Sequence, residues 1–207
     1  MPETPDLSHI ALAILAGGQS RRMGIAKTSL QIDGRPILKY LLQQMSWPGP
    51  KLLVSAPSRR NPPGRELFDS EVVDAVEGEG PLRGVLTALL QCTTEMIIIC
   101  TVDMPAVGLA QLRWIVQELA DADQLDGLMP RRWVDGQDQI EPFPLACRKS
   151  AEGAVEKQLG IKRSVHALLE LPRFAVKDAP RDWPASVWTN LNSPEDFEAF
   201  LASRRPG

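Results

Sequence analysis

Short apolar runs alternate with longer amphipathic segments over the first 120 residues. Four such runs predict buried strands, at 10–15, 52–56, 72–75 and 96–100. Between them, apolar residues spaced three and four apart predict helices from Pro36 to about residue 45, from Pro81 to about residue 90, and over 109–120. The pattern predicts an α/β fold, in which helices cover both faces of a mostly parallel sheet.

The second half of the chain is less regular. Its expected elements are a strand at 125–129, a turn at Asp135-Gly136, helices near 149–159 and 164–170, and a strand at 173–176. Residues 143–147 are apolar but contain Pro144, which predicts an edge strand or a bulge because proline cannot donate to a sheet ladder. Ser193 and Pro194 predict the N-cap and first turn of a last helix.

No repeat or low-complexity linker interrupts the chain. We therefore expect one domain over residues 1–207, with loose tails at 1–8 and 203–207.

Composition and charge narrow the class of protein. The 207 residues are 43% hydrophobic and 24% charged, which is typical of a globular domain. A net charge of −3 argues against a dominant basic face, so nucleic acid is not an expected partner. No run of 18 apolar residues exists, so no membrane span is expected. The acidic, Pro-containing N-terminus is also unlike a signal peptide.

Cysteine and histidine are scarce and scattered. The three cysteines are expected as small core residues in a reducing compartment, which predicts a cytoplasmic protein. The two histidines lie far apart in sequence, so a histidine-based metal site or a Ser/His triad is poorly supported.

The stretch from Leu15 to Lys27 follows the first predicted strand and holds three glycines, two arginines and one lysine. Glycines let backbone N–H groups turn toward a phosphate, and the cations suit a ligand with several negative charges. This predicts a nucleoside triphosphate site, although an ordinary surface loop remains the alternative. The stretch is neither a Walker loop, which needs Gly-Lys-Ser/Thr, nor a G-x-G-x-x-G fingerprint.

Polar residues at other predicted strand ends could complete this site. Asp103 directly follows the strand at 96–100 and suits Mg²⁺, although it could equally cap the next helix. Asp74 could hold a base or a ribose hydroxyl, or could simply be a turn residue. Asn190 and Asn192 alternate along a segment predicted to be extended, so both amides would point the same way. Ligands of open α/β sheets bind at the carboxyl ends of the strands, which favours one site shared by these residues and the stretch from Leu15 to Lys27.

Taken together, these residues resemble the molybdenum cofactor guanylyltransferase family, among nucleotidyltransferases of the glycosyltransferase-A-like fold. The resemblance spans residues 12 to 200. It is carried by Leu15–Lys27, Gly80-Pro81-Leu82-x-Gly84, Asp103-Met104-Pro105 and Asn190-Leu191-Asn192-Ser193-Pro194-Glu195-Asp196. It implies a three-layer α/β/α, Rossmann-like nucleotide-diphospho-sugar transferase fold. It also implies transfer of GMP from GTP to molybdopterin, with release of pyrophosphate.

The resemblance also implies roles for individual residues. The nucleotide would lie against Leu15, Ala16, Gly17, Gly18, Ser55 and Asp74, with Asp74 on the guanosine part. The catalytic residues would be Lys27 and Arg22, which hold the triphosphate, and Asp103, which binds Mg²⁺. Asn190 and Asn192 would lie on the molybdopterin side. A phosphate nucleophile needs no strong base, so catalysis would come from positioning and charge neutralisation.

Four positions differ from the residues usual in the family. They are Ala26 for Asp, Ser55 for Asn, Arg83 for Ala, and Glu141 for the His of a His-Pro pair. Three alternatives therefore stay open: a molybdopterin cytidylyltransferase, a sugar-phosphate nucleotidyltransferase, or a catalytically weak nucleotide-binding paralogue. Gly17 favours guanine, since the cytidylyl branch usually has Ala there. The expected partners are GTP, molybdopterin and proteins that insert the finished cofactor, and the expected state is a monomer or weak homo-oligomer.

Overall fold

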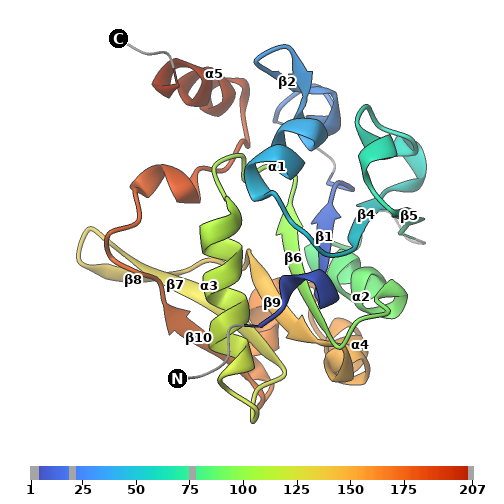
Figure 1. Ribbon diagram of the computed structural model, residues 1–207, viewed down its shortest axis with the longest axis vertical. Coiled ribbons are helices and arrows are strands. Elements are labelled where there is room, and N and C mark those ends of the chain that lie inside the picture. Colours follow the sequence, from blue (N-terminus) through green and yellow to red (C-terminus); the bar gives the residue numbers. More distant parts are fainter. Residues whose placement is uncertain (1–4, 19–21, 75–77, 205–207) are drawn as a thin grey trace.

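An eight-stranded mixed sheet runs through the computed structural model, which describes residues 5–18, 22–74 and 78–204 (Figure 1). The strands are β1 (Ala11–Leu15), β4 (Lys51–Ser55), β5 (Ser70–Val73), β6 (Met96–Thr101), β7 (Gly127–Val134), β8 (Gln137–Ile140), β9 (Leu145–Arg148) and β10 (Phe174–Asp178). Their order is β10-β7-β9-β6-β1-β4-β5, with β8 paired to β7. β1 is parallel to β4 and β6, whereas β9 is antiparallel to β6 and β7.

Helices cover both faces of the sheet. They are α1 (Ile37–Met45), α2 (Pro81–Gln91), α3 (Leu109–Ala120), α4 (Glu152–Leu159) and α5 (Pro194–Ser203). α1 packs beside α3 on one face, and α2 packs beside α4 on the other (Figure 1). The predicted three-layer α/β/α architecture is therefore confirmed. In the described part of the chain, no helix is long and apolar enough to cross a membrane.

Short elements connect these layers. The 3-10 helices are η1 (Leu7–His9), η2 (Lys27–Ser29), η3 (Pro57–Arg59), η4 (Arg65–Leu67), η5 (Lys149–Ala151), η6 (Val165–Glu170) and η7 (Ala185–Trp188). A small hairpin, β2 (Gln31–Ile32) with β3 (Arg35–Pro36), turns at Asp33 and Gly34, both at positive φ. Asp135 and Gly136 likewise turn at positive φ between β7 and β8, as predicted.

The core explains why the strands form where the apolar runs lie. All five residues of β1 are buried, because both faces of this central strand are covered. Cys92, Cys100 and Cys147 are buried free thiols in the same hydrophobic cluster, which confirms the prediction that they are core residues.

Three predictions about the fold were wrong. β9 is an inner strand rather than an edge strand, because Pro144 precedes the strand and lies outside its ladder. The expected N-terminal tail is not loose from residue 5 onward. Leu7 is 5% exposed within η1, and the Asp6 carboxylate accepts a hydrogen bond from the Ser8 N–H. The segment expected to be extended up to residue 192 instead contains η7 and a tight turn, in which the Asn192 N–H donates to the Asn190 carbonyl.

The last helix confirms its predicted cap. The Ser193 hydroxyl accepts a hydrogen bond from the Asp196 N–H, and the Asp196 carboxylate accepts one from the Ser193 N–H. The helix continues to Ser203, so the expected C-terminal tail begins later. Residues 1–4 and 205–207 of the expected tails, Arg21 of the glycine loop and Ala75 of the expected third strand lie outside the described residues.

Candidate functional site

A cavity of about 510 Å³ opens where β1, β4 and β6 end. This volume is typical of a small-molecule pocket. The predicted site residues that line it are Leu15, Ala16, Gly17, Gly18, Arg22, Lys27, Ser55, Asp74, Asp103 and Asn192. The fold therefore gathers segments almost 180 residues apart at the carboxyl edge of the sheet, where open α/β sheets bind ligands.

The end of β1 is held in place by its neighbours. The Ala16 N–H donates to the Val54 carbonyl, and the Val102 N–H donates to the Leu15 carbonyl. The Leu15 side chain packs against α2 at Gly84. A Cβ built on Gly84 would lie 3.2 and 3.3 Å from the two Cδ atoms of Leu15. Glycine at 84 thus makes room for a pocket-lining side chain, a role that the sequence motif alone did not reveal.

Lys27 and Asp103 lie together inside the cavity. The Lys27 ammonium is 2.6 Å from Asp103 Oδ2, and their side chains are only 13% and 21% exposed. The same ammonium donates to Asn192 Oδ1 at 3.0 Å. Three predicted site residues, from the glycine loop, the end of β6 and the segment before α5, therefore form one contact group.

Ala26 occupies the N-cap of η2. Its backbone is extended and no side chain caps the turn. An aspartate at an N-cap accepts a hydrogen bond from backbone N–H groups of the first turn. The family's usual Asp would supply that bond, whereas here Lys27 is oriented by Asp103 and Asn192.

Ser55 lines the cavity, but its hydroxyl is committed elsewhere. It donates to Glu71 Oε1 at 2.5 Å. Glu71 also accepts from the Asn61 N–H and from Arg65 Nε, at 3.2 and 3.3 Å. The Glu71 side chain is 8% exposed, so this network braces the cavity wall formed by β4 and β5. Glu71 stands in no motif or periodic pattern that could have marked it.

Asp74 lines the cavity from the end of β5 and is oriented by α2. Thr87 donates its hydroxyl to Asp74 Oδ1 at 3.0 Å. Arg83 Nε lies 3.8 Å from the same oxygen and 2.9 Å from Glu79 Oε2. Arg83, which departs from the family's usual Ala, thus adds a positive charge beside Asp74 and Glu79. Glu79 also lines the cavity and had not been singled out from the sequence.

Arg59 reaches the glycine loop from η3. Its guanidinium donates to the Gly18 carbonyl. Arg59 was not among the predicted site residues, so this contact was missed. The density of arginines there was the only available signal.

Asn190 does not join the cavity, which corrects one predicted site residue. Its Nδ2 donates to the Trp188 carbonyl at 3.2 Å, and only Asn192 lines the cavity. The alternation that would put both amides on one side requires an extended strand, and residues 190–192 form a turn instead.

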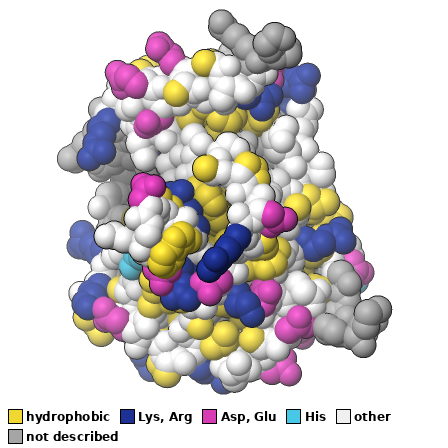
Figure 2. All heavy atoms as spheres, turned by 90° about the vertical axis from the view of Figure 1, so that its left-hand side faces the viewer, with side chains coloured by type: hydrophobic (Ala, Val, Ile, Leu, Met, Phe, Trp, Pro, Cys, Tyr) yellow, Lys and Arg dark blue, Asp and Glu magenta, His cyan; other side chains and the backbone are white. Residues whose placement is uncertain are grey.

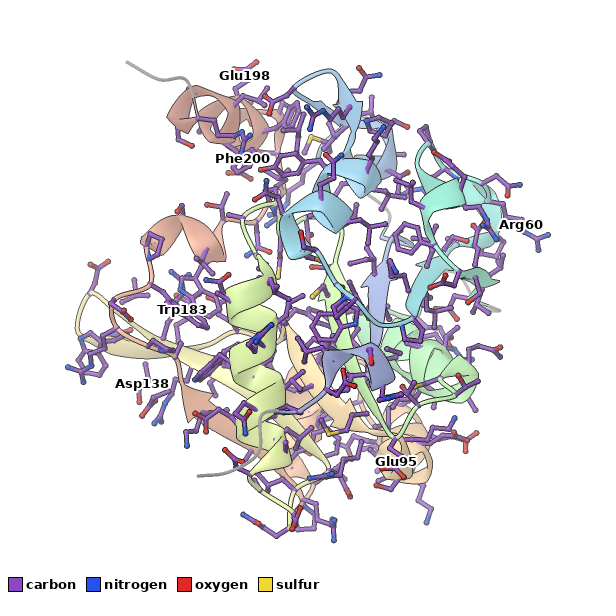
Figure 3. The ribbon with its side chains drawn as sticks, in the orientation of Figure 1. Arg60, Glu95, Asp138, Trp183, Glu198 and Phe200 are labelled. Carbon is purple, nitrogen blue, oxygen red and sulfur yellow. The ribbon has the colours of Figure 1, made fainter. Side chains whose placement is uncertain are left out.

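Aromatic contacts anchor both ends of the segment 183–200, which carries Asn192. Trp183, labelled in Figure 3, packs edge-on against Trp114 of α3, with ring centroids 5.1 Å apart. Its ring also lies beside Trp188, with centroids 5.9 Å apart. After Asn192, Phe200 of α5, also labelled in Figure 3, packs edge-on against Tyr40 of α1, with ring centroids 6.4 Å apart. The segment between the two contacts is therefore tied to the layer of α1 and α3.

The face of the molecule that carries the β7–β8 hairpin has both positively and negatively charged side chains. Lys and Arg side chains alternate there with Asp and Glu around small hydrophobic areas (Figure 2). Trp133 of β7 is 61% exposed.

The donor set fits a magnesium ion held partly by substrate. Among the described residues, no group of three His, Cys, Asp or Glu side chains could hold a metal. Mg²⁺ is commonly bound through one or two carboxylates, with substrate phosphates and water completing its shell. Asp103, beside a glycine-rich loop and two cations, matches that mode.

The family model described as "MobA-like NTP transferase domain" matches residues 12–175. The chain belongs to this family. A molybdenum cofactor guanylyltransferase of Syntrophotalea carbinolica is 30% identical over 205 residues, covering 94% of this chain and 90% of that protein. A probable molybdenum cofactor guanylyltransferase of Methanosarcina acetivorans is 28% identical over 212 residues, covering 92% and 89%.

The solved structure of another protein has the same fold as this chain. Molybdopterin-guanine dinucleotide biosynthesis protein A from Archaeoglobus fulgidus superposes with a TM-score of 0.77, at 22% identity, covering 93% of this chain and 97% of that one. The predicted family and the predicted nucleotidyltransferase fold are thereby confirmed.

Proposed function

We propose that this chain transfers GMP from GTP to molybdopterin, forming the guanine dinucleotide cofactor and pyrophosphate in the cytoplasm. One observation carries the proposal. The glycine loop, Lys27 and Asp103 line one cavity at the carboxyl edge of the sheet, in a chain whose relatives are named molybdenum cofactor guanylyltransferases.

The nucleotide would lie along the end of β1. Leu15, Ala16, Gly17 and Gly18 would present backbone groups to it, as their place in the cavity wall supports. Asp74 would accept hydrogen bonds from the guanosine part, oriented by Thr87. Arg22 and Lys27 would face the triphosphate, since both cations line the same cavity.

The chemistry needs a phosphate oxygen of the acceptor to attack the α-phosphorus of GTP while the bond to pyrophosphate breaks. Lys27 and Arg22 would offset the negative charge that builds on the leaving pyrophosphate. Asp103 would hold Mg²⁺, which supplies Lewis-acid and template chemistry when bound. Asn192, on the cavity wall beside Lys27, would face the acceptor side. No side chain has to act as a strong base, because the acceptor phosphate is already ionised.

The deciding experiment measures pyrophosphate release from the purified chain with molybdopterin, Mg²⁺ and either GTP or CTP. We expect release with GTP, and none without molybdopterin. Faster release with CTP would replace this proposal by a cytidylyltransferase, which Gly17 in place of the branch's usual Ala argues against. GTP binding in calorimetry without any release would instead indicate a weak, nucleotide-binding paralogue, the alternative that Ala26 and Ser55 keep open.

A further inference from the structure

Among the described residues, two oxygens of different charge contact the Lys27 ammonium. Its ammonium contacts the Asp103 carboxylate at 2.6 Å and the Asn192 side-chain oxygen at 3.0 Å. An ammonium has only donors, so the oxygen of the Asn192 amide must be the atom that faces it. One contact is a charge pair, and the other is a hydrogen bond from the ammonium to an uncharged oxygen.

The backbone of Asn192 is fixed independently of Lys27. Its N–H donates to Asp196 Oδ2 at 3.0 Å and to the Asn190 carbonyl at 3.1 Å. The adjacent Leu191 N–H donates to the Asp103 carbonyl at 2.9 Å. Hydrogen bonding to the Asn192 N–H is the first cause that holds the pKa of the Asp196 carboxyl below its ordinary value. The backbone of Asn192 therefore stays beside Asp103 whether or not Lys27 contacts its side chain.

A divalent cation on Asp103 would compete with Lys27 for the same carboxylate. The ammonium already sits at hydrogen-bond distance from Asp103 Oδ2, and like charges a few ångströms apart repel strongly in a partly buried site. This repulsion favours movement of the ammonium away from Asp103 when the cation arrives. Of Asp103 and Asn192, only Asn192 offers Lys27 an uncharged oxygen that a cation on Asp103 leaves available.

We propose that Lys27 serves as a built-in counter-ion of Asp103 in the metal-free chain, and that Asn192 is the positioning residue that retains Lys27 when a divalent cation displaces it. This inference rests on the proposed assignment of the metal to Asp103. It gives Asn192 a task on the nucleotide side of the site, separate from contact with the acceptor. It also explains how Lys27 stays placed for the phosphates without an aspartate at position 26.

The test measures Mn²⁺ affinity by electron paramagnetic resonance on the full chain, without nucleotide or molybdopterin. Lys27→Met removes the competing charge and should tighten Mn²⁺ binding about tenfold, the effect of losing one part-buried ion pair. Asn192→Leu leaves the displaced Lys27 without its retaining oxygen and should weaken binding about threefold to fivefold, as expected for one hydrogen bond. In the Lys27→Met background, Asn192→Leu should change nothing, because the two effects share one interaction.

Further variants separate positioning from a structural role. Asn192→Ser, which shortens the side chain with less loss of polarity, should weaken Mn²⁺ binding in the same direction as Asn192→Leu. Asn190→Leu, two residues away and bonded to Trp188, should leave Mn²⁺ affinity unchanged in both backgrounds. An equal effect of Asn192→Leu with and without Lys27 would overturn the inference, and so would unchanged affinity in Lys27→Met.

Failure of this inference and failure of the proposed function give different results. If wild type binds Mn²⁺, Asp103→Asn abolishes binding and the double-mutant cycle shows no coupling, then only the role of Asn192 falls. If Asp103→Asn binds Mn²⁺ as wild type does, the metal assignment falls together with this inference. If neither binds it, only this inference falls, because the metal assigned to Asp103 is held partly by substrate phosphates, which this test leaves out. If the cycle shows coupling but no pyrophosphate is released, only the guanylyltransferase proposal falls.

Discussion

At the scale of single residues, Lys27 and Asp103 neutralise each other inside the cavity, so each depends on the other before any ligand arrives. We expect Lys27→Ala and Asp103→Asn to lower kcat for GMP transfer by about a hundredfold to a thousandfold, the usual cost of removing one charge-stabilising group. The fold should persist, because both side chains lie in a solvent-accessible cavity rather than in the core. Steady-state pyrophosphate release and far-ultraviolet circular dichroism check the two halves of this prediction.

Asp123→Asn is the matched control for Asp103→Asn. Its side chain is 99% exposed, and its contact with Arg148 is 3.6 Å long. Exposed pairs of this kind contribute little, so turnover and stability should equal those of wild type. Near-normal turnover in purified, folded Lys27→Ala would remove Lys27 from the mechanism.

Glu71 joins three separate residues beside the cavity through hydrogen bonds. It accepts from Ser55, Asn61 and Arg65 while its side chain is 8% exposed. Glu71→Ala should lower the free energy of unfolding by about 2–4 kcal/mol, because three donors lose their acceptor and one of them is a charge. Urea unfolding measures this as a lower midpoint at an unchanged m-value.

Glu66→Ala controls for the loss of a glutamate from the same region. Glu66 is an exposed residue of η4, so its replacement should stay within about 0.5 kcal/mol of wild type. Equal destabilisation by the two variants would mean that the hydrogen bonds of Glu71 do not support the wall between β4 and β5.

At the scale of elements, two helical glycines meet opposite surroundings. A Cβ on Gly84 of α2 would press on Leu15 at 3.2 Å, whereas a Cβ on the exposed Gly153 of α4 would meet nothing within 4 Å. Gly84→Val should therefore destabilise the fold by about 1–3 kcal/mol through overpacking. It should also weaken GTP binding, because Leu15 lines the cavity. Gly153→Ala should stabilise by about 0.5–1 kcal/mol, since alanine favours a helix.

Thermal unfolding of both variants, with GTP calorimetry on Gly84→Val, tests this contrast. A stabilised Gly84→Val would show that Leu15 repacks freely and that α2 does not fix the end of β1. Unchanged GTP affinity in a destabilised variant would separate the packing of Leu15 from ligand binding.

Elements were predictable wherever local pattern decided them. The helix over 109–120 was expected at the bounds that α3 has, because four buried apolar residues repeat along one face. β9 was assigned to the wrong place in the sheet, because its neighbours β6 and β7 are chosen by the whole fold rather than by its own residues. The turn at 190–192 was missed for the same reason. There the Asn192 N–H donates to the Asn190 carbonyl, whereas extended backbone was expected.

The cavity-lining residues were predictable only through motifs. Lys27, Asp103 and Asn192 stood in recognisable motifs, and the fold brings them together. Glu71 and Arg59 stood in none, and their cavity-lining partners, Ser55 and Gly18, lie 16 and 41 residues away. A single sequence holds no local signal for such contacts, because they depend on where separate loops meet after folding.

At the scale of the whole molecule, the site exists only when the sheet is complete. Lys27 and Asn192 are 165 residues apart in sequence and share one hydrogen bond. The glycine loop, the ends of β4 and β6 and the segment before α5 contribute to one cavity wall. Loss of global structure should therefore abolish nucleotide binding in the same transition that unfolds the core.

The three cysteines report on that global transition. Cys92, Cys100 and Cys147 are buried free thiols in the core, and burial raises the pKa of the Cys100 and Cys147 thiols well above their ordinary value. The thiolate is the reactive form, so a disulfide reagent should modify the native chain more than about a thousandfold slower than the urea-unfolded chain. GTP with Mg²⁺ should slow the native reaction further, because a ligand that binds only the folded state lowers the population of open forms. Absorbance of the released thiol measures both rates. Rapid modification of all three thiols in the native chain would show that the core opens without global unfolding, and protection that ignores GTP would separate core opening from the site.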